Sequence, residues 1–229
     1  KMDFEQAIDQ GMIVMIGDEV EEAYLDEVQK QCVNPELAKE KGDTLKFVYT
    51  PFHGAGNKPV RKILKRIGFN NVVVVKEQEL PDGDFPTVES PNPENKEGFK
   101  LAIGYAKECG ADLIVGTDPD SDRVGILVKN DKGEYVTFTG NQVGTLLSEY
   151  ILSALAEKDA VPKDGYIVKT IVTTNIIQAI CDAYGIEMKE VLTGFKFIGE
   201  KIKESEETGI GTYIFGFEES YGCLLYTSP

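Results

Sequence analysis

Three aspartates stand at alternate positions in a segment that reads GTDPDSDRVGI, from Gly116 to Ile126. In an extended or turning loop, alternate side chains point the same way, so Asp118, Asp120 and Asp122 can direct their carboxylates at one point. Carboxylates packed this closely repel one another unless a cation neutralises them. Hard oxygen ligands without cysteine or histidine favour magnesium, manganese or calcium over zinc. The spacing therefore predicts a loop that binds a divalent cation.

Three other interpretations of this loop were weighed. An EF-hand loop that begins at Asp118 requires glycine at its sixth position and a carboxylate at its twelfth, but it has Arg123 and Lys129 there. An aspartyl-phosphate phosphatase uses a DxD pair just after a strand, which Asp118 and Asp120 could supply, although the third aspartate and Arg123 fit this class less well. A solvated acidic turn is the third possibility, and the apolar segments on both sides of the loop argue against it.

The predicted cation-binding loop, Asp118–Arg123, is called the metal loop. The elements around it should form a parallel sheet covered by helices, because predicted strands alternate with predicted helices. In chain order they are a strand at Leu45–Tyr49, a helix at Lys58–Ile67, a strand at Val72–Val75, a proline-rich loop at Pro81–Pro93, a helix at Lys96–Cys109 that Gly110 ends, and strands at Leu113–Val115 and Val124–Val128. Ligands of such sheets gather at the carboxyl ends of the strands, where the aspartates lie.

A second α/β unit should begin after a hairpin turn at Asn130–Gly133. Its expected elements are a helix that Thr139 caps and that runs to about Glu157, a strand at Ile167–Lys169, a helix at Thr174–Tyr184, a strand at Met188–Leu192, a helix at Phe197–Glu206 and a strand at Tyr213–Phe217. The predicted fold class is α/β, with two consecutive three-layer α/β/α domains whose sheets are mixed and mainly parallel. The segment Met2–Asp18, with an amphipathic helix and a short apolar strand at Met12–Ile16, should belong to another domain because it cannot enclose a core.

Composition narrows the range of partners. The 229 residues are 41% hydrophobic and 28% charged, and 24 Lys and Arg against 39 Asp and Glu give a net charge of −15. Such a charge repels nucleic acid and anionic membranes, so we expect neither as a partner. No apolar run approaches the roughly 20 residues of a membrane span, and no leader pattern begins the chain. The scattered cysteines indicate neither a zinc site nor a disulfide framework, which favours a cytoplasmic location: Cys32, Cys109, Cys181 and Cys223.

Three further motifs accompany the metal loop: TPFHGAG at Thr50–Gly56, LTGFKFIGE at Leu192–Glu200, and FGFEESYG at Phe215–Gly222. In this order and at these separations, the four motifs resemble the α-D-phosphohexomutase superfamily of phosphoglucomutases and phosphomannomutases. The phosphoglucomutase branch is the most similar, and FEESYG favours glucose over mannose.

The resemblance implies a four-domain enzyme that interconverts glucose 1-phosphate and glucose 6-phosphate. A phosphoserine in domain I donates the phosphoryl group, glucose 1,6-bisphosphate is the intermediate, and Mg²⁺ in domain II neutralises charge. This chain would then be a fragment: residues 1–20 a remnant of the end of domain I, residues 21–135 domain II with its magnesium-binding loop, and residues 136–229 domain III with its sugar-binding loop. Domains I and IV would be its missing partners.

The resemblance also implies roles for individual residues. Asp118, Asp120 and Asp122 match the magnesium ligands, and Arg123 matches an arginine that contacts phosphate, although a salt bridge to its own aspartates is the alternative. Other matches fall in the two loops that bind the sugar: Thr193, Gly194 and Lys196 in one, and Glu218 and Ser220 in the other. Lys196 could equally be a simple surface charge, and Glu219 should point away from the sugar.

The chain departs from the family pattern in two places. No segment resembles the phosphoserine loop, which reads like TASHNP, so we predict no catalytic nucleophile here and no activity of the fragment alone. The tail at about 225–229 follows no family pattern, so domain III should be incomplete. His53, the only histidine, is interpreted as part of a structural turn. A magnesium- and sugar-phosphate-binding module without activity, or an aspartate-dependent phosphatase, stay open as alternatives.

Overall fold

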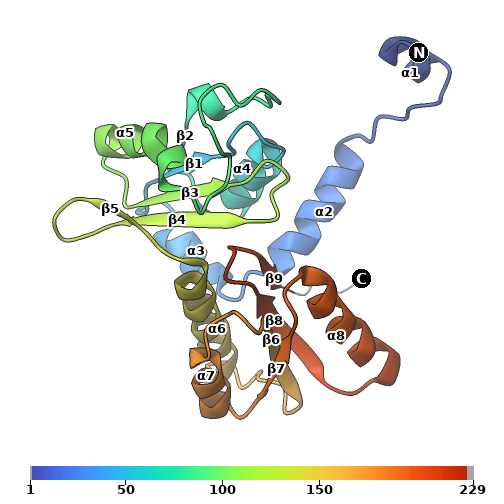
Figure 1. The fold of residues 1–229 in the computed structure, drawn as a ribbon, viewed down its shortest axis with the longest axis vertical. Helices are drawn as coiled ribbons and strands as arrows, with labels where there is room; N and C mark the ends of the chain where they lie inside the picture. The colour runs from blue at the N-terminus through green and yellow to red at the C-terminus, as the bar shows by residue number, and fades with distance from the viewer. Residues whose placement is uncertain (1, 226–229) are drawn as a thin grey trace.

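The computed structural model describes residues 2–225, which form two α/β units in series (Figure 1). The sheet of the first unit has the strand order β2-β1-β3-β4-β5. Its parallel strands are β1 (Phe47–Thr50), β2 (Val72–Val74) and β3 (Leu113–Thr117). Two antiparallel strands, β4 (Val124–Lys129) and β5 (Tyr135–Thr137), complete it. The metal loop is the connection between β3 and β4.

Helices cover both faces of this first sheet. The chain moves from β1 outward to β2 through α4 (Asn57–Arg66), and then back past β1 to β3 through α5 (Lys100–Cys109). Because parallel crossovers are right-handed, these opposite movements place the two helices on opposite faces. Short 3₁₀ turns occur at Lys76–Gln78 and Lys96–Phe99, the second leading directly into α5. Buried apolar side chains of β1, β3 and α5, including Val48, Ile114 and Ala102, form the core on one face.

The sheet of the second unit has the order β7-β6-β8-β9. The strands β6 (Gly165–Thr170), β7 (Glu187–Val191) and β8 (Thr212–Phe217) are parallel, and β9 (Cys223–Leu225) runs antiparallel to β8. All six residues of β6 are buried, as expected for a central strand with both faces covered.

Three helices pack on the two faces of this second sheet. Apolar side chains of α6 (Gly140–Ala156) and α7 (Ile176–Tyr184) form one core with β6 and β8, and α8 (Phe195–Thr208) forms another on the opposite face. The predicted fold class of two consecutive α/β units with mixed sheets is therefore confirmed. The predicted cap of α6 is also confirmed: Thr139 Oγ1 accepts the amide of Gln142, whose side chain in turn accepts the amide of Thr139.

In the first part of the chain, the predicted strand at Met12–Ile16 is wrong. Helix α1 (Phe4–Asp9) is present, but Met12–Ile16, predicted as a strand, is irregular and largely exposed. A strand requires a hydrogen-bonded neighbour, and Figure 1 shows this segment and α1 lying apart from both sheets. Two helices that were not predicted follow, α2 (Asp18–Lys30) and α3 (Pro35–Lys41). Helix α2 packs along α4, with Lys62 paired to Glu21 and Arg66 paired to Asp26.

Most of the other predicted elements occur with ends shifted by one or a few residues. The strands β5 and β9 were missed, and Leu225, which was placed in the foreign tail, pairs with Phe215 as part of β9. The rest of that tail, residues 226–229, lies outside the described residues. Among residues 2–225, no helix is both long enough and apolar enough to cross a bilayer.

Candidate metal and sugar-binding site

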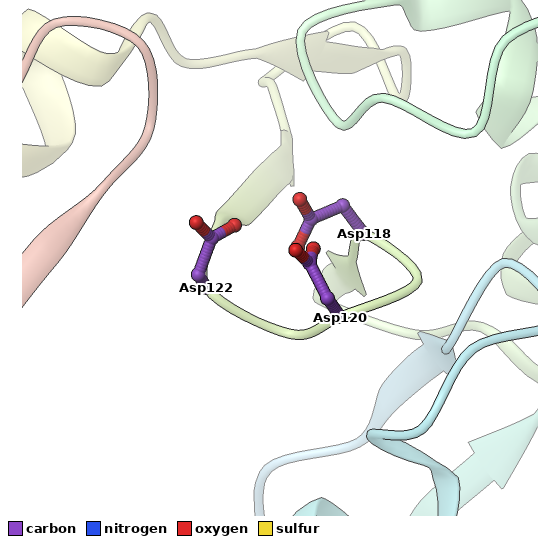
Figure 2. A group of neighbouring side chains, drawn as sticks. All are labelled: Asp118, Asp120 and Asp122. Carbon is purple, nitrogen blue, oxygen red and sulfur yellow. The ribbon is translucent and has the colours of Figure 1, made fainter.

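The metal loop begins directly where β3 ends. Thr117 pairs with Val124 across the two strands, and the six residues between them form a tight turn. The turn closes through a hydrogen bond from the Ser121 amide to the Asp118 carbonyl, 3.1 Å long, and Ser121 has a left-handed φ of 64°. One oxygen each of Asp118, Asp120 and Asp122 lies within 4.8 Å of the others, and Figure 2 shows the carboxylates on the same side of the loop. The predicted convergence is therefore present.

Asp118 differs from the other two aspartates in its burial. It is 7% exposed, whereas Asp120 and Asp122 are exposed, and its Oδ1 accepts the Arg123 amide at 3.0 Å. Burial raises the pKa of Asp118 from 3.8 to about 7; the amide of Arg123 opposes this, while the neighbouring Asp122 and Asp120 add to it. A cation bound by the cluster would favour the ionised form of Asp118 and so oppose this shift.

The TPFHGAG segment packs closely against the metal loop. The Ala55 amide donates to the Pro119 carbonyl at 2.8 Å, and a Cβ on Gly54 would come within 2.3 Å of Pro119. A Cβ on Gly56 would lie 2.5 Å from Ser121 Oγ. Only glycine permits these approaches, so this segment fixes the shape of the loop.

His53 occupies a structural turn within this segment. Its Nδ1 lies 3.2 Å from the Leu80 carbonyl oxygen and its Nε2 lies 2.8 Å from Thr87 Oγ1. The residue is 5% exposed and has a left-handed φ of 62°. Both ring nitrogens therefore serve to hold the loop that follows β2, in agreement with the structural interpretation.

Arg123 is half-exposed and has more than one carboxylate nearby. Its Nη1 lies 3.3 Å from Glu94 Oε1, while its Nε lies 3.9 Å from Asp118 Oδ2 and 4.0 Å from Asp122 Oδ1. The alternative considered for Arg123, pairing with its own aspartates, is thus present at the limit of an ion pair. The shortest of the three contacts is with Glu94, which the sequence did not single out. Such exposed pairs are weak, so the guanidinium can exchange partners.

The FEESYG motif forms a second turn, which follows β8. Glu218 is 7% exposed, and its Oε1 accepts the Gly194 amide at 2.5 Å, which joins the two predicted sugar loops. Gly194 has a φ of 125°, and Thr193 and Lys196 beside it are exposed. The Lys196 ammonium lies 4.7 Å from the centre of the Phe197 ring. Ser220 is partly buried.

The metal loop and the FEESYG turn are joined by their main chains. The Val124 amide donates to the Tyr221 carbonyl at 3.1 Å, and Arg123 and Gly222 form an antiparallel bridge. Gly222 itself is in close contact with Phe195, because a Cβ at this position would lie 2.4 Å from the ring. Residues predicted separately in two units are therefore brought to one place.

Two models of known protein families match this chain. Residues 22–133 match the model for phosphoglucomutase/phosphomannomutase α/β/α domain II, and residues 139–228 match the model for α/β/α domain III of the same proteins. The chain belongs to the phosphoglucomutase/phosphomannomutase family. The predicted resemblance is thereby confirmed.

Individual relatives of this mutase-family chain differ in their activities. It is 35% identical over 224 residues to a phosphoglucomutase of Staphylococcus saprophyticus, covering 98% of this chain and 39% of that protein. It is 34% identical over 205 residues to a human phosphopentomutase, covering 88% of this chain and 33% of the relative. The chain therefore spans well under half the length of these relatives.

The fold of this family member also matches solved structures. An Aspergillus fumigatus N-acetylphosphoglucosamine mutase in complex with GlcNAc-6P and magnesium superimposes with a TM-score of 0.58 at 14% identity, covering 88% of this chain and 40% of that one. At this identity, the likeness concerns the fold.

One buried cation near the site was missed by the sequence-based predictions. Lys169 is fully buried at the carboxyl end of β6, where its ammonium group contacts Glu190 Oε2 at 2.5 Å and donates to the carbonyl oxygens of Thr170 and Thr173. A lysine inside an otherwise apolar strand is the signal that could have revealed it, because buried charges require specific partners.

Proposed function

We propose that this chain forms the magnesium-binding and sugar-binding part of a hexose-phosphate mutase that interconverts glucose 1-phosphate and glucose 6-phosphate. Glucose 1,6-bisphosphate would be the intermediate, and a phosphoserine in a domain outside this chain would carry the phosphoryl group. Membership of the family supports a mutase as the parent protein. The domain boundaries at residues 20 and 135 belong to the same proposal, as do domains I and IV as partners.

The pairing of Arg123 with Gly222 is the observation that carries this proposal. It places a cluster of carboxylates and a guanidinium beside a turn that presents Glu218 and Ser220. A metal-bound phosphoryl group and the hydroxyls of one hexose could therefore be held at the same time. Positioning of the reacting groups, together with electrostatic stabilisation, provides most of the catalysis of phosphoryl transfer.

Asp118, Asp120 and Asp122 would hold Mg²⁺. The donor set fits this ion because it consists of three hard oxygens that already converge. When bound, the ion supplies positive charge that stabilises a transferring phosphoryl group. A fold neighbour whose structure contains magnesium and a sugar phosphate is consistent with this assignment.

Arg123 would contact phosphate oxygens with its planar guanidinium. Its side chain is 38% exposed, and that of its partner Glu94 is 41% exposed. An incoming phosphate can displace such a pair at little cost, because exposed ion pairs contribute about 0–1 kcal/mol. The arginine is thus close to the metal loop and available to a dianionic ligand.

Glu218 and Ser220 would bind adjacent hydroxyls of the hexose. Within residues 2–225, Oε1 of Glu218 is occupied by the Gly194 amide, and Oε2 is left to accept a hydroxyl. Thr193 and Lys196 stand on the exposed side of the neighbouring loop, where they would contact the same sugar. Gly194 would contribute close main-chain approach.

Calorimetry and a turnover assay test this proposal together. With saturating Mg²⁺, the chain should bind glucose 1-phosphate but produce no glucose 6-phosphate, because no phosphoserine segment is present in the sequence. Absence of binding would contradict the assignment of the sugar loops, and robust turnover would contradict the assignment of the nucleophile to another domain. Release of phosphate from an aryl phosphate that disappears in Asp118→Asn would instead support the phosphatase alternative.

A further inference from the structure

Glu219 lies between the two predicted sugar contacts, and its carboxylate points to a different part of the second unit. Its Oε2 lies 3.2 Å from Oγ1 of Thr170 and 3.2 Å from Oγ1 of Thr173. The two hydroxyl oxygens are themselves 2.7 Å apart, so the three oxygens form a closed triangle. Thr170 is 0% and Thr173 is 3% exposed, so both hydroxyls that bind this carboxylate are buried, and hydrogen bonds in such surroundings are stronger than in water.

The two threonines form a rigid anchor. Thr170 is the last residue of β6, and the Thr173 amide donates to the Thr170 carbonyl at 3.0 Å. The buried ammonium of Lys169 binds the carbonyl oxygens of both residues, at 3.3 and 3.2 Å. The carboxylate of Glu219 is therefore tied to the central strand of its sheet, whose position is fixed on both faces.

The main chain of the same turn is held as closely as the side chain. A Cβ on Gly140, the first residue of α6, would lie 2.0 Å from the Glu219 carbonyl oxygen and 2.9 Å from the Tyr221 nitrogen. Tyr221 has a left-handed φ of 70°, a conformation that a non-glycine residue keeps only when its surroundings impose it. The carbonyl of Tyr221 then accepts the Val124 amide from the metal loop.

We propose that Glu219 is a positioning residue for the sugar site, which holds the FEESYG turn in register with the metal loop without touching the sugar. Its anchor on Thr170 and Thr173 fixes the main chain on which Glu218 and Ser220 stand. The same anchor fixes the Tyr221 carbonyl that pairs with Val124. This inference rests on the proposed function, since it names a determinant of the same sugar-phosphate site.

The first test measures the geometry of the turn without any sugar. Residue-resolved amide exchange reports on Gly194, bonded to Glu218, and on Val124, bonded to Tyr221. In Glu219→Ala, both amides should exchange at least about tenfold faster, because the turn opens locally. In Glu219→Gln, which keeps an acceptor oxygen for the threonines, exchange should stay within about threefold of the wild type.

The second test measures the affinity for glucose 1-phosphate at saturating Mg²⁺. Glu219→Ala should weaken it by about tenfold or more, since small displacements of binding groups cost up to about a hundredfold. Glu219→Gln should restore it. Thr173→Val should weaken binding of glucose 1-phosphate as much as Glu219→Ala does. A variant that carries both substitutions should bind no more weakly than the single variant with the lower affinity, because both substitutions break the same anchor. The control is Glu207→Ala, an exposed glutamate at the other end of α8 whose loss changes the charge equally.

Two results would overturn the inference. Unchanged exchange of Gly194 and Val124 in Glu219→Ala would show that the turn does not depend on this carboxylate. Equal loss of affinity in Glu219→Gln and Glu219→Ala, with unchanged melting temperatures, would show that the charge itself contacts the ligand. If the wild-type chain bound no glucose 1-phosphate, the proposed function would fail, and the exchange experiment would still decide whether Glu219 positions the turn.

Discussion

Val124 and Tyr221 are joined by a main-chain hydrogen bond of 3.1 Å between the metal loop of one α/β unit and the FEESYG turn of the other. The neighbouring bridge between Arg123 and Gly222 makes this a short antiparallel pairing. Because main-chain pairing fixes both partners, the distance between the carboxylate cluster and the sugar loop is set by the fold.

Gly222→Ala should destabilise the junction. The new Cβ would lie 2.4 Å from the Phe195 ring, so either the ring or the turn must move. Overpacking of this kind costs about 1–3 kcal/mol of unfolding free energy, which urea denaturation measures. Gly199→Ala is the matched control: it lies in α8 with no atom near its Cβ position, and it should be neutral or stabilising. Equal stability of the two variants would contradict the tight contact.

Asp120→Asn should weaken Mg²⁺ binding by about tenfold or more while leaving the metal-free protein as stable as the wild type or more so. The substitution removes one ligand, but it also removes one of the neighbouring carboxylates that raise the pKa of Asp118. The rise in melting temperature on addition of Mg²⁺ should shrink accordingly. Asp131→Asn, on the exposed β4–β5 turn, is the control. A wild-type response to Mg²⁺ in Asp120→Asn would show that the cluster does not bind the ion.

The affinity for Mg²⁺ should depend on pH. Since the pKa of Asp118 is raised to about 7, the carboxyl carries a proton below that pH, and the ion must displace it. Affinity should therefore fall by about tenfold per pH unit below pH 7 and level off above it. The same pKa shift affects the unfolding free energy of the metal-free protein. The protonated Asp118 stabilises the folded state below about pH 4, and this contribution is lost as the pH rises through about 7.

Calorimetry in two buffers with different ionisation enthalpies measures the proton release directly. At pH 6 each bound Mg²⁺ should release nearly one proton, and at pH 8.5 almost none. An affinity that did not change between pH 5.5 and 8 would contradict the assignment of Asp118 as a ligand with a raised pKa.

Thr139→Ala should lower the unfolding free energy by about 1 kcal/mol, within the 0.5–2 kcal/mol range of lost helix caps. The Thr139 hydroxyl accepts the Gln142 amide and begins α6, which packs against the FEESYG turn through Gly140. Thr139→Ser keeps the hydroxyl and should unfold at the wild-type urea concentration. If Ala and Ser at this position were equally stable, the cap would contribute nothing.

Local patterns in the sequence were sufficient for most of the elements. Apolar runs located β1 and β3, Gly110 marked the end of α5 with its left-handed φ of 67°, and the cap of α6 was recognisable from Thr139. The spacing of the aspartates correctly predicted their convergence, because alternation within one short loop is a local property.

Contacts between distant segments could not be predicted in the same way. Met12–Ile16 has the composition of a strand, but a strand forms only beside a partner strand, and among the described residues no strand pairs with it. The amides of Met12 and Ile13 donate to the Ala7 carbonyl instead. Glu94 and Arg123 are separated by 29 positions, and Glu219 and Thr170 by 49. Such pairs depend on how the sheets and loops come together, which no local pattern records.

The carboxylate cluster and the FEESYG turn should act as one site for a phosphorylated hexose. Calorimetric titration of glucose 1,6-bisphosphate with and without Mg²⁺ would show whether they do. In the wild type, Mg²⁺ should tighten binding by about tenfold or more, and Asp120→Asn should abolish this gain. Equal affinities for the bisphosphate in the presence and absence of Mg²⁺ would contradict the claim.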